Sequence, residues 1–511
     1  MKQGGETGNY DMTELKIRCG MGQRLQRSMT MVGNGWALWR ATRGVSALAL
    51  ALVAGSALAQ AARSPESILP APAPAPTVKP SQQPTGSAPV PTPAPVPAAT
   101  PAPPATQEPA APTIEPELPV LEPVLAWQVA DAQVLAKVIE GIGAHGLIPA
   151  DYQLADLRAA ILAGPGAALD AQASRSFAWL IEDMRDGRTR MDSRVQWFVV
   201  DPDVDQSPTA TVMADALASK DIAGAIAKLA PTHPDYAKLK DALAKAPATD
   251  KATRALIQVN MDRWRWLPRD LGKFYLLTNV PEFQLRLTVD NAIIRSYRTI
   301  VGKPGRTATP QLAEVVEGVV FNPTWTVPQS IVKGEGLGAQ LLANPAKAKR
   351  ENYKVTKNKD GSITVVQQPG PGNALGLMKL DMPNEHAIFL HDTPNRNLFK
   401  LAQRALSHGC VRTERATELA ITMAILGAGV TPDDAVAIVT SGKYTRVAMT
   451  RTFPVYLTYF TMASDITGKM GKFGDLYGRD APVLASFTAP RAAWDGKRKS
   501  TETVIKLDSP L

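Results

Sequence analysis

The chain has 511 residues, a formal net charge of +9 and an apolar content of 45%, which is ordinary for a globular protein. The basic balance favours acidic partners in general, but it does not identify them. Only two cysteines and five histidines are present, so the position of each of these residues is informative.

The N-terminal 59 residues are typical of an export signal. Five arginines form a basic region, and the apolar run from Val45 to Ala59 follows it. Ala57-Leu58-Ala59 is a small-x-small cleavage site, which predicts cleavage before Gln60. The run is shorter than the about 20 residues of a membrane-spanning helix. An uncleaved N-terminal membrane anchor is the alternative.

Export changes the meaning of the two cysteines. Cys19 lies in the predicted signal, so its removal leaves Cys410 as the only thiol and excludes an intramolecular disulfide. A single cysteine in an exported protein indicates a reactive thiol or an intermolecular bridge, and the alternative is a buried small hydrophobe. Export also argues against nucleic acid as a partner, whereas an anionic cell-wall polymer fits the positive charge.

Composition divides the chain into a signal, a linker, a helical domain, a mostly-β domain, a C-terminal strand extension and a tail. These segments are predicted over residues 1–59, 60–123, 124–250, 270–445, 446–485 and 486–511. The linker is rich in proline and alanine, which favours an extended chain. In the helical domain, one helix is expected to bury Val134, Leu135, Val138 and Ile139. His145 and His233 are expected to be surface residues near turns.

Alternating apolar residues indicate the β domain. The segment from Phe283 to Val289 alternates cleanly, and Asp290-Asn291 predicts a turn into a second strand of a hairpin. A charged insertion over residues 329–360 is expected to begin as a helix and to form a lid over a cleft. Further strands are expected in VVEGVVFNPTWTVP, SITVVQQ, HAIFLHD, AVAIVT and FPVYLTYFT.

The hexapeptide SHGCVR brings the scarce residue types together. It contains His408 and Cys410, and His391 ends a predicted strand upstream. A nearby imidazole lowers the pKa of a thiol and favours the nucleophilic thiolate. Gly409 lets a substrate carbonyl come close, and the N–H groups of Gly409 and Cys410 are natural oxyanion donors. A helix carrying Ala416, Leu419, Met423 and Leu426 is expected to begin directly after the cysteine, with its dipole favouring negative charge.

These residue types permit three interpretations. The first is a cysteine enzyme that transfers acyl groups, and the second is a zinc site made by two histidines and one cysteine. The third is that the residues are close in sequence without a shared role. The zinc interpretation has unusual spacing and no evident fourth ligand, so no metal or other cofactor is expected.

The segment HDTPNRNLFKLAQRALSHGCVR resembles the motif of the L,D-transpeptidase, or YkuD, family: a histidine, a spacer, Ser/Thr-His-Gly-Cys, an apolar residue and Asn or Arg. The segments IVGKPGRTATP, FNPTWTVPQSI, PGPGNALG and LYGRD are similar to the larger, YcbB-like members, and GLIPADYQL resembles their scaffold domain. The resemblance covers residues 125–480. It implies a multidomain α+β protein, in which a small helical scaffold domain precedes a mostly-β catalytic domain with a lid-like insertion.

The resemblance also implies roles for the scarce residues. Cys410 corresponds to the nucleophile. His391 corresponds to the general base and acid, oriented by the backbone carbonyl of Asp392. His408 corresponds to the second histidine beside the sulfur.

The resemblance implies supporting roles as well. Arg412 is expected to fix the substrate or the loop, and Trp325 to line the donor groove or to pack in the core. Ser407 is expected either to hydrogen-bond near the thiolate or to shape the turn. Phe389 departs from the tyrosine of many YcbB-like members, which puts a complete oxyanion hole in doubt. The peptidoglycan-binding repeat that these members often carry has no convincing copy here.

The expected function is therefore that of a periplasmic, wall-associated peptidoglycan L,D-transpeptidase. By resemblance, it would join stem peptides by 3→3 cross-links and be trapped by carbapenems. An L,D-carboxypeptidase or a cell-wall amidase would use the same cysteine with water as the acceptor. A catalytically silent wall-binding protein is the third alternative.

Overall fold

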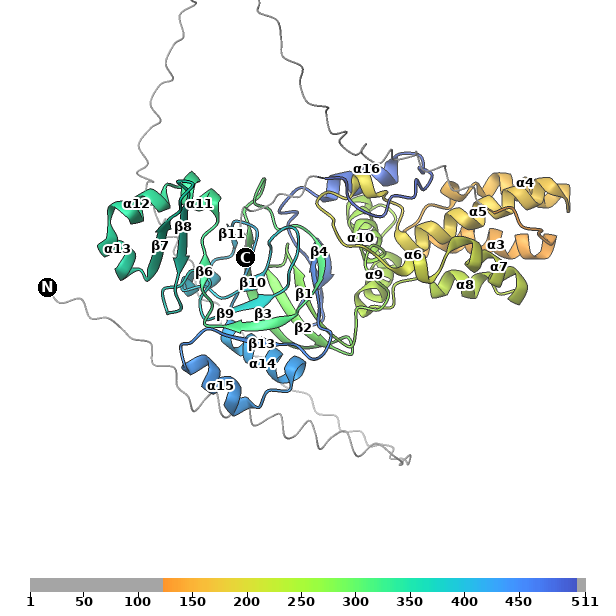
Figure 1. Ribbon diagram of the computed structural model, residues 1–511. Coiled ribbons are helices and arrows are strands. Elements are labelled where there is room, and N and C mark those ends of the chain that lie inside the picture. The colour runs from red at the N-terminus through yellow and green to blue at the C-terminus, as the bar shows by residue number, and fades with distance from the viewer. Residues whose placement is uncertain (1–122, 503–511) are drawn as a thin grey trace, which may run out of the picture. The chain divides into compact units, whose positions relative to one another are not determined.

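The computed structural model describes residues 123–502 (Figure 1). The predicted signal peptide and nearly all of the predicted linker lie outside these residues. Among the described helices, none combines the length and the apolar character needed to cross a membrane.

The first described region is helical, as predicted. Its α-helices are α3 (Val129–Gly141), α4 (Leu154–Ala163), α5 (Ala167–Asp186), α6 (Asp203–Gln206), α7 (Thr209–Ser219), α8 (Ile222–Lys228), α9 (Pro234–Lys245) and α10 (Lys251–Trp264). The buried face of α3 differs from the prediction in one residue, because Val134 is 41% exposed. Helical spacing instead aligns Leu135 and Ile139 with two small buried residues, Ala132 and Ala136.

Two histidines of this region are not the plain surface residues that the sequence predicts. His145 bonds Tyr236 Oη through Nδ1 at 2.9 Å and accepts from Lys240 at Nε2 at 3.0 Å. His233 caps α9, where its Nδ1 accepts from the Asp235 N–H, and its ring stacks on Trp264 with centroids 4.2 Å apart. Both therefore hold the helical region together.

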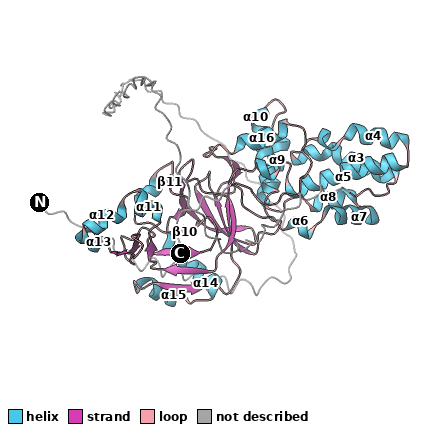
Figure 2. Ribbon diagram, turned by 45° about the horizontal axis from the view of Figure 1, so that its top comes forward, coloured by secondary structure: helices cyan, strands magenta, loops and turns pink. Residues whose placement is uncertain are grey.

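A large mixed sheet follows, with the strand order β13-β5-β9-β10-β12-β3-β2-β1-β14-β4 and with β11 beside β3. Its strands are β1 (Phe274–Asn279), β2 (Gln284–Val289), β3 (Ala292–Gly302), β4 (Leu312–Val315), β5 (Gly318–Phe321), β9 (Met378–Asp381), β10 (Leu390–His391), β11 (Ala405–Ser407), β12 (Val411–Thr413), β13 (Thr445–Ala448) and β14 (Pro454–Thr458). The predicted hairpin is confirmed as β2 and β3, joined at Asp290-Asn291. Helix α14 (Ala416–Ala428) packs against β5 and β9 (Figure 2).

The predicted strand AVAIVT is wrong, because it lies in helix α15 (Pro432–Thr440). Thr431 caps this helix by accepting from the Asp434 N–H at 3.1 Å, and Pro432 occupies its first turn. A proline at this position and acidic residues in the first turn both favour a helix start. These signals outweigh the β-branched residues that suggested a strand.

The charged insertion forms a small unit of its own, here called the insertion module (residues 325–367). It contains β6 (Trp325–Thr326), α11 (Gln329–Gly334), α12 (Leu337–Ala343), α13 (Pro345–Arg350), β7 (Tyr353–Lys357) and β8 (Ile363–Gln367). Its strands pair in the order β6-β8-β7, apart from the large sheet. Its buried core consists of Val327, Val332, Leu341, Ala348 and Val365.

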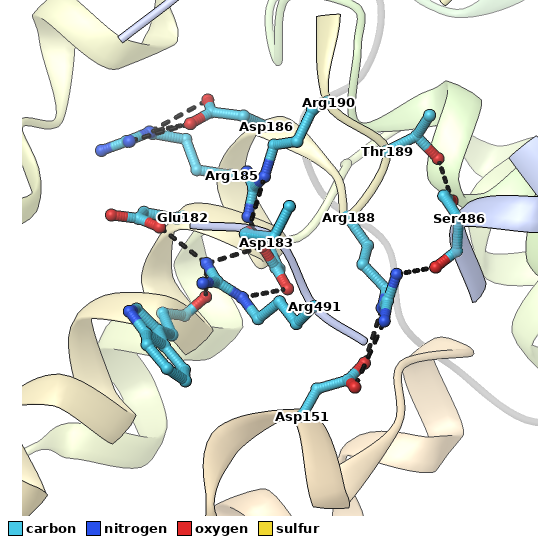
Figure 3. A network of polar contacts seen from close by, with 12 residues as sticks. Asp151, Glu182, Asp183, Arg185, Asp186, Arg188, Thr189, Arg190, Ser486 and Arg491 are labelled. Atoms are coloured by element: carbon cyan, nitrogen blue, oxygen red, sulfur yellow. Dashed lines mark hydrogen bonds and ion pairs between the residues drawn. The ribbon is translucent and has the colours of Figure 1, made fainter. Parts of the chain in front are cut away.

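The C-terminal residues are built into the fold. Strand β14 pairs in parallel with β1, and the hairpin of β15 (Met462–Ser464) and β16 (Met470–Lys472) precedes helix α16 (Asp480–Thr488). In the predicted tail, the Arg491 side chain is only 3% exposed and pairs with Glu182 at 2.6 Å and with Asp183 at 3.0 Å (Figure 3). This ion network joins the C-terminal segment to α5.

Candidate active site

Strand register gathers the functional side chains on one face of the sheet. His391 on β10 is the register partner of Arg412 on β12 and of Lys379 on β9. Register partners project to the same face, and so do residues two positions apart along a strand. Phe389 and Cys410 therefore accompany His391 and Arg412, and all of these side chains line one cavity.

The cavity has a volume of about 570 Å³ and lies between the sheet and the insertion module. Cys410, His391, Lys379 and Arg412 line its sheet side. The module contributes Trp325, Thr326, Pro328, Ile331, Glu335, Leu337 and Tyr353. Trp325 lines the cavity and also packs against the core of the module, so both of its predicted environments are present. The insertion thus lines the cleft and forms one of its walls, and its action as a lid stays a prediction.

Cys410 lies in the short connection between β11 and β12, and its side chain is partly exposed. Its thiol donates to the Ala387 carbonyl at 3.7 Å. Burial raises the pKa of Cys410 to about 11, and the Phe389 backbone, Lys379 and Arg412 oppose this shift. The free protein therefore holds a protonated thiol at neutral pH.

The expected helix directly after Cys410 is wrong, because α14 begins only at Ala416. Strand β12 comes first, and Arg415 turns the chain with a φ of +50°. A helix dipole acts mainly over its own first turn, so α14 does not supply the predicted stabilisation of the thiolate. Instead, the nearby charges of Lys379 and Arg412 act to lower the pKa of the thiol.

The turn before Cys410 is closed by Ser407. Its Oγ donates to the Cys410 carbonyl at 2.6 Å and accepts from the Gly409 N–H at 3.1 Å. Ser407 thus shapes the turn, which was one of its two predicted roles. The Gly409 N–H is occupied and is not a free oxyanion donor, which corrects the prediction. The Cys410 N–H has no acceptor among the described residues, so it is the better candidate.

Gly409 is also held from its other side. Its φ of +123° is a conformation that a side chain disfavours. The Gly409 carbonyl accepts from Thr309 Oγ1 at 2.7 Å, and Thr309 Oγ1 accepts from the Gly302 N–H at 2.9 Å. The sequence reasoning missed Thr309, although it belongs to the segment IVGKPGRTATP.

His391 is 5% exposed, and burial, reinforced by the charges of Arg412 and Lys379, lowers its pKa to about 3. The imidazole is therefore neutral and able to accept a proton. The backbone of Asp392 acts in the opposite direction on the pKa, but no hydrogen bond of ordinary geometry reaches Nδ1 within residues 123–502. Orientation of His391 by the Asp392 carbonyl stays a prediction.

The Asp392 side chain supports the neighbouring loop. Its Oδ2 accepts from the Leu377 N–H at 2.9 Å and pairs with Arg396 at 2.9 Å. Gly376 lies so close that a Cβ there would sit 2.3 Å from the same oxygen, and its φ is +64°. The glycine therefore leaves room for a carboxylate that fixes the wall beside His391.

His408 has a different environment from His391. Its side chain is 50% exposed, and Nε2 lies 3.9 Å from Glu335 Oε1 of the insertion module. Both residues line the cavity. Within residues 123–502, no group of three or more His, Cys, Asp or Glu side chains is arranged to hold a metal ion.

Lys379 is a second residue that sequence reasoning missed. Its Nζ lies 4.3 Å from the centroid of the Phe389 ring, and burial lowers the pKa of the ammonium group. No motif marks Lys379 in the sequence, because only the pairing of β9 with β10 brings it beside His391.

Two family models match parts of the chain. Residues 273–439 match the family model of the L,D-transpeptidase catalytic domain, YkuD, and residues 123–243 match that of the scaffold domain. A curated protein of Haemophilus influenzae named "Putative L,D-transpeptidase" is 31% identical over 242 residues, covering 44% of this chain and 48% of that protein. The chain thus spans about half the length of the curated relative that it matches.

Two solved structures give weaker likenesses. An L,D-transpeptidase from Mycobacterium smegmatis is 12% identical, with a TM-score of 0.18 over 36% of this chain and 58% of that chain. L,D-transpeptidase 1 of Mycobacterium tuberculosis is 11% identical, with a TM-score of 0.17 over 36% of this chain and 61% of that chain. The family matches carry the assignment: following a scaffold domain, residues 273–439 of this chain belong to the YkuD family of L,D-transpeptidase catalytic domains.

Proposed function

We propose that the chain is an exported, periplasmic peptidoglycan L,D-transpeptidase that forms 3→3 cross-links through a thioester on Cys410. The observation that carries this proposal is the strand register, which places the side chains of Cys410 and His391 on one face, where both line the same cavity. Covalent acyl transfer needs a nucleophile and a base, and a thiol and a neutral imidazole on one face can supply them. The YkuD match over residues 273–439 supports the same reaction class.

The first half-reaction begins from a neutral pair. As the Cys410 sulfur attacks the carbonyl at the L centre of diaminopimelate in a donor tetrapeptide stem, His391 takes the thiol proton. The Cys410 N–H, which has no acceptor within residues 123–502, would stabilise the oxyanion. The nearby charges of Lys379 and Arg412 favour negative charge at the sulfur. The carbon–nitrogen bond to D-Ala then breaks, and the proton on His391 passes to the leaving amine.

The second half-reaction transfers the acyl group. The side-chain amine of diaminopimelate in another stem attacks the thioester carbonyl, the carbon–sulfur bond breaks, and a proton returns to the sulfur through His391. If water attacks instead, the same site acts as an L,D-carboxypeptidase or amidase. The partial exposure of Cys410 leaves this second candidate open to test.

The test is incubation of the purified mature protein with tetrapeptide muropeptides, followed by mass spectrometry. We expect cross-linked dimers, and tripeptides alone would show hydrolysis instead. Cys410→Ala should abolish both products and the covalent adduct with a carbapenem. Unchanged product formation by this variant would overturn the mechanism.

Unprocessed full-length protein in cell fractions would contradict the proposed cleavage before Gln60.

A further inference from the structure

The two sides of the cavity differ in charge. Lys379 and Arg412 line the sheet side close to Cys410. Glu335 lines the opposite wall, at the C-terminal end of α11 in the insertion module, and its side chain is 60% exposed. The cavity thus holds two cations close to the reacting cysteine and a carboxylate on the insertion module.

The carboxylate of Glu335 is available for a ligand. In the described part of the chain, His408 at 3.9 Å is the only charged partner found for it, and that partner is cationic only when protonated. Asp381 also lines the cavity, but Arg446 Nε pairs with it at 2.6 Å. Glu335 is therefore the acidic group of the cavity that lacks a permanent counter-ion.

Transpeptidation brings two differently charged groups to this cavity. Donor stems carry carboxylates, which complement Lys379 and Arg412, whereas the acceptor brings a primary amine that is an ammonium ion at neutral pH. The cations beside Cys410 repel that ammonium, and the carboxylate of Glu335 attracts it. Electrostatic attraction therefore favours approach of the acceptor along the insertion module.

We infer that Glu335 is the acceptor-binding residue, which holds the ammonium group of the incoming stem beside His408 until the amine attacks the thioester on Cys410. This inference rests on the proposed transpeptidase function. The ammonium releases one proton to water at the exposed carboxylate, and the free amine forms the carbon–nitrogen bond. The carbon–sulfur bond breaks, and the second amine proton reaches the sulfur through His391.

The test compares Glu335→Gln with Glu351→Gln, which removes a carboxylate from the same module outside the cavity. Both variants and the wild type receive tetrapeptide muropeptides, and dimers and tripeptides are quantified. In Glu335→Gln we expect the ratio of dimer to tripeptide to fall about two- to fivefold, as the loss of one exposed and partly screened charge pair predicts. The KM for the acceptor should rise, while Glu351→Gln should keep the wild-type ratio.

Two further measurements separate charge from structure. Glu335→Asp should restore at least half of the lost dimer ratio, because it keeps the carboxylate. Raising the salt concentration should lower the dimer ratio of the wild type but should not lower that of Glu335→Gln, since the variant lacks the attraction and screening there weakens only the repulsion of the ammonium by Lys379 and Arg412. An unchanged dimer ratio in Glu335→Gln would overturn the inference alone. Tripeptides alone from the wild type would overturn the transpeptidase function together with it.

Discussion

His391 and Arg412 are register partners on adjacent parallel strands, and this pairing puts a base and a cation on the face of the sheet that carries Cys410. Burial keeps the imidazole neutral, and the charge of Arg412 strengthens that effect. The same cation opposes the burial that raises the pKa of Cys410. Arg412 therefore favours a neutral His391 and a thiol that can lose its proton. Cys410 and His391 are expected to transfer this proton when the sulfur attacks, and not to form an ion pair in the free protein.

The different environments of His391 and His408 predict different mutant phenotypes. His391→Gln should slow acylation by about 10²- to 10⁴-fold, the usual contribution of a positioned general base. His408→Gln should slow acylation by less than about tenfold, because its exposed ring faces Glu335. The rate of carbapenem adduct formation, followed by mass spectrometry, measures both. Equal losses would contradict the assignment of His391 as the base.

The shifted pKa values predict an unusual pH dependence of acylation. The pKa of His391 is lowered to about 3 and that of Cys410 is raised to about 11, so both groups stay neutral between these limits. The rate of adduct formation at subsaturating carbapenem should therefore lack the inflection near pH 6.5 that an unperturbed histidine would give. An inflection there that survives in His408→Gln would contradict the neutral pair.

Histidines with lowered pKa values also make the free energy of unfolding depend on pH. His145, like His391, has its pKa lowered to about 3, whereas an unfolded histidine titrates near 6.5. Below pH 6.5 the unfolded chain binds more protons, so stability should fall as the pH drops from about 6.5 to 3. Denaturant titrations of His145→Gln should show a shallower fall than the wild type. An unaltered slope would contradict this reasoning, and the exposed His408→Gln serves as the control.

Phe389 offers a direct test of the missing phenol. Its ring shares the face of Cys410, so Phe389→Tyr should add a hydrogen-bond donor near the oxyanion and raise the acylation rate severalfold. Phe389→Leu, which removes the ring without adding a donor, should give no gain. Acylation rates with the same carbapenem compare the two variants. A lower rate in Phe389→Tyr would count against a missing phenol.

The Arg491 side chain predicts a large effect on stability far from the cavity. Arg491→Ala leaves the buried Glu182 and Asp183 without this partner, which should reduce the free energy of unfolding by about 3–5 kcal/mol. Lys497→Ala removes exposed ion pairs in the same segment and should change the free energy of unfolding far less than Arg491→Ala does. Denaturant unfolding of both variants tests this contrast. Similar losses would show that Arg491 does not anchor the C-terminal segment.

Local patterns predicted the hairpin, the helical region and the strand-borne His391, because they depend on periodicities that neighbouring residues display. They failed for AVAIVT, where a short apolar run suits a strand or a helix equally and the cap at Thr431 decides. Local patterns failed again for two histidines. His145 bonds Tyr236, which is distant in sequence, and the ring of His233 stacks on that of Trp264. The segment limits beyond the matched residues 123–243 and 273–439 stay predictions.

The sequence by itself determined the family and singled out Cys410 and His391, since one motif contains both residues and the spacing between them. Only the tertiary structure decided what surrounds them. Lys379 joins the site through strand register, and Glu335 through the placement of the insertion module. The occupied Gly409 N–H and the neutral His391 follow from hydrogen bonding and burial in the folded chain. These properties depend on contacts between segments far apart in the sequence, which no local pattern encodes.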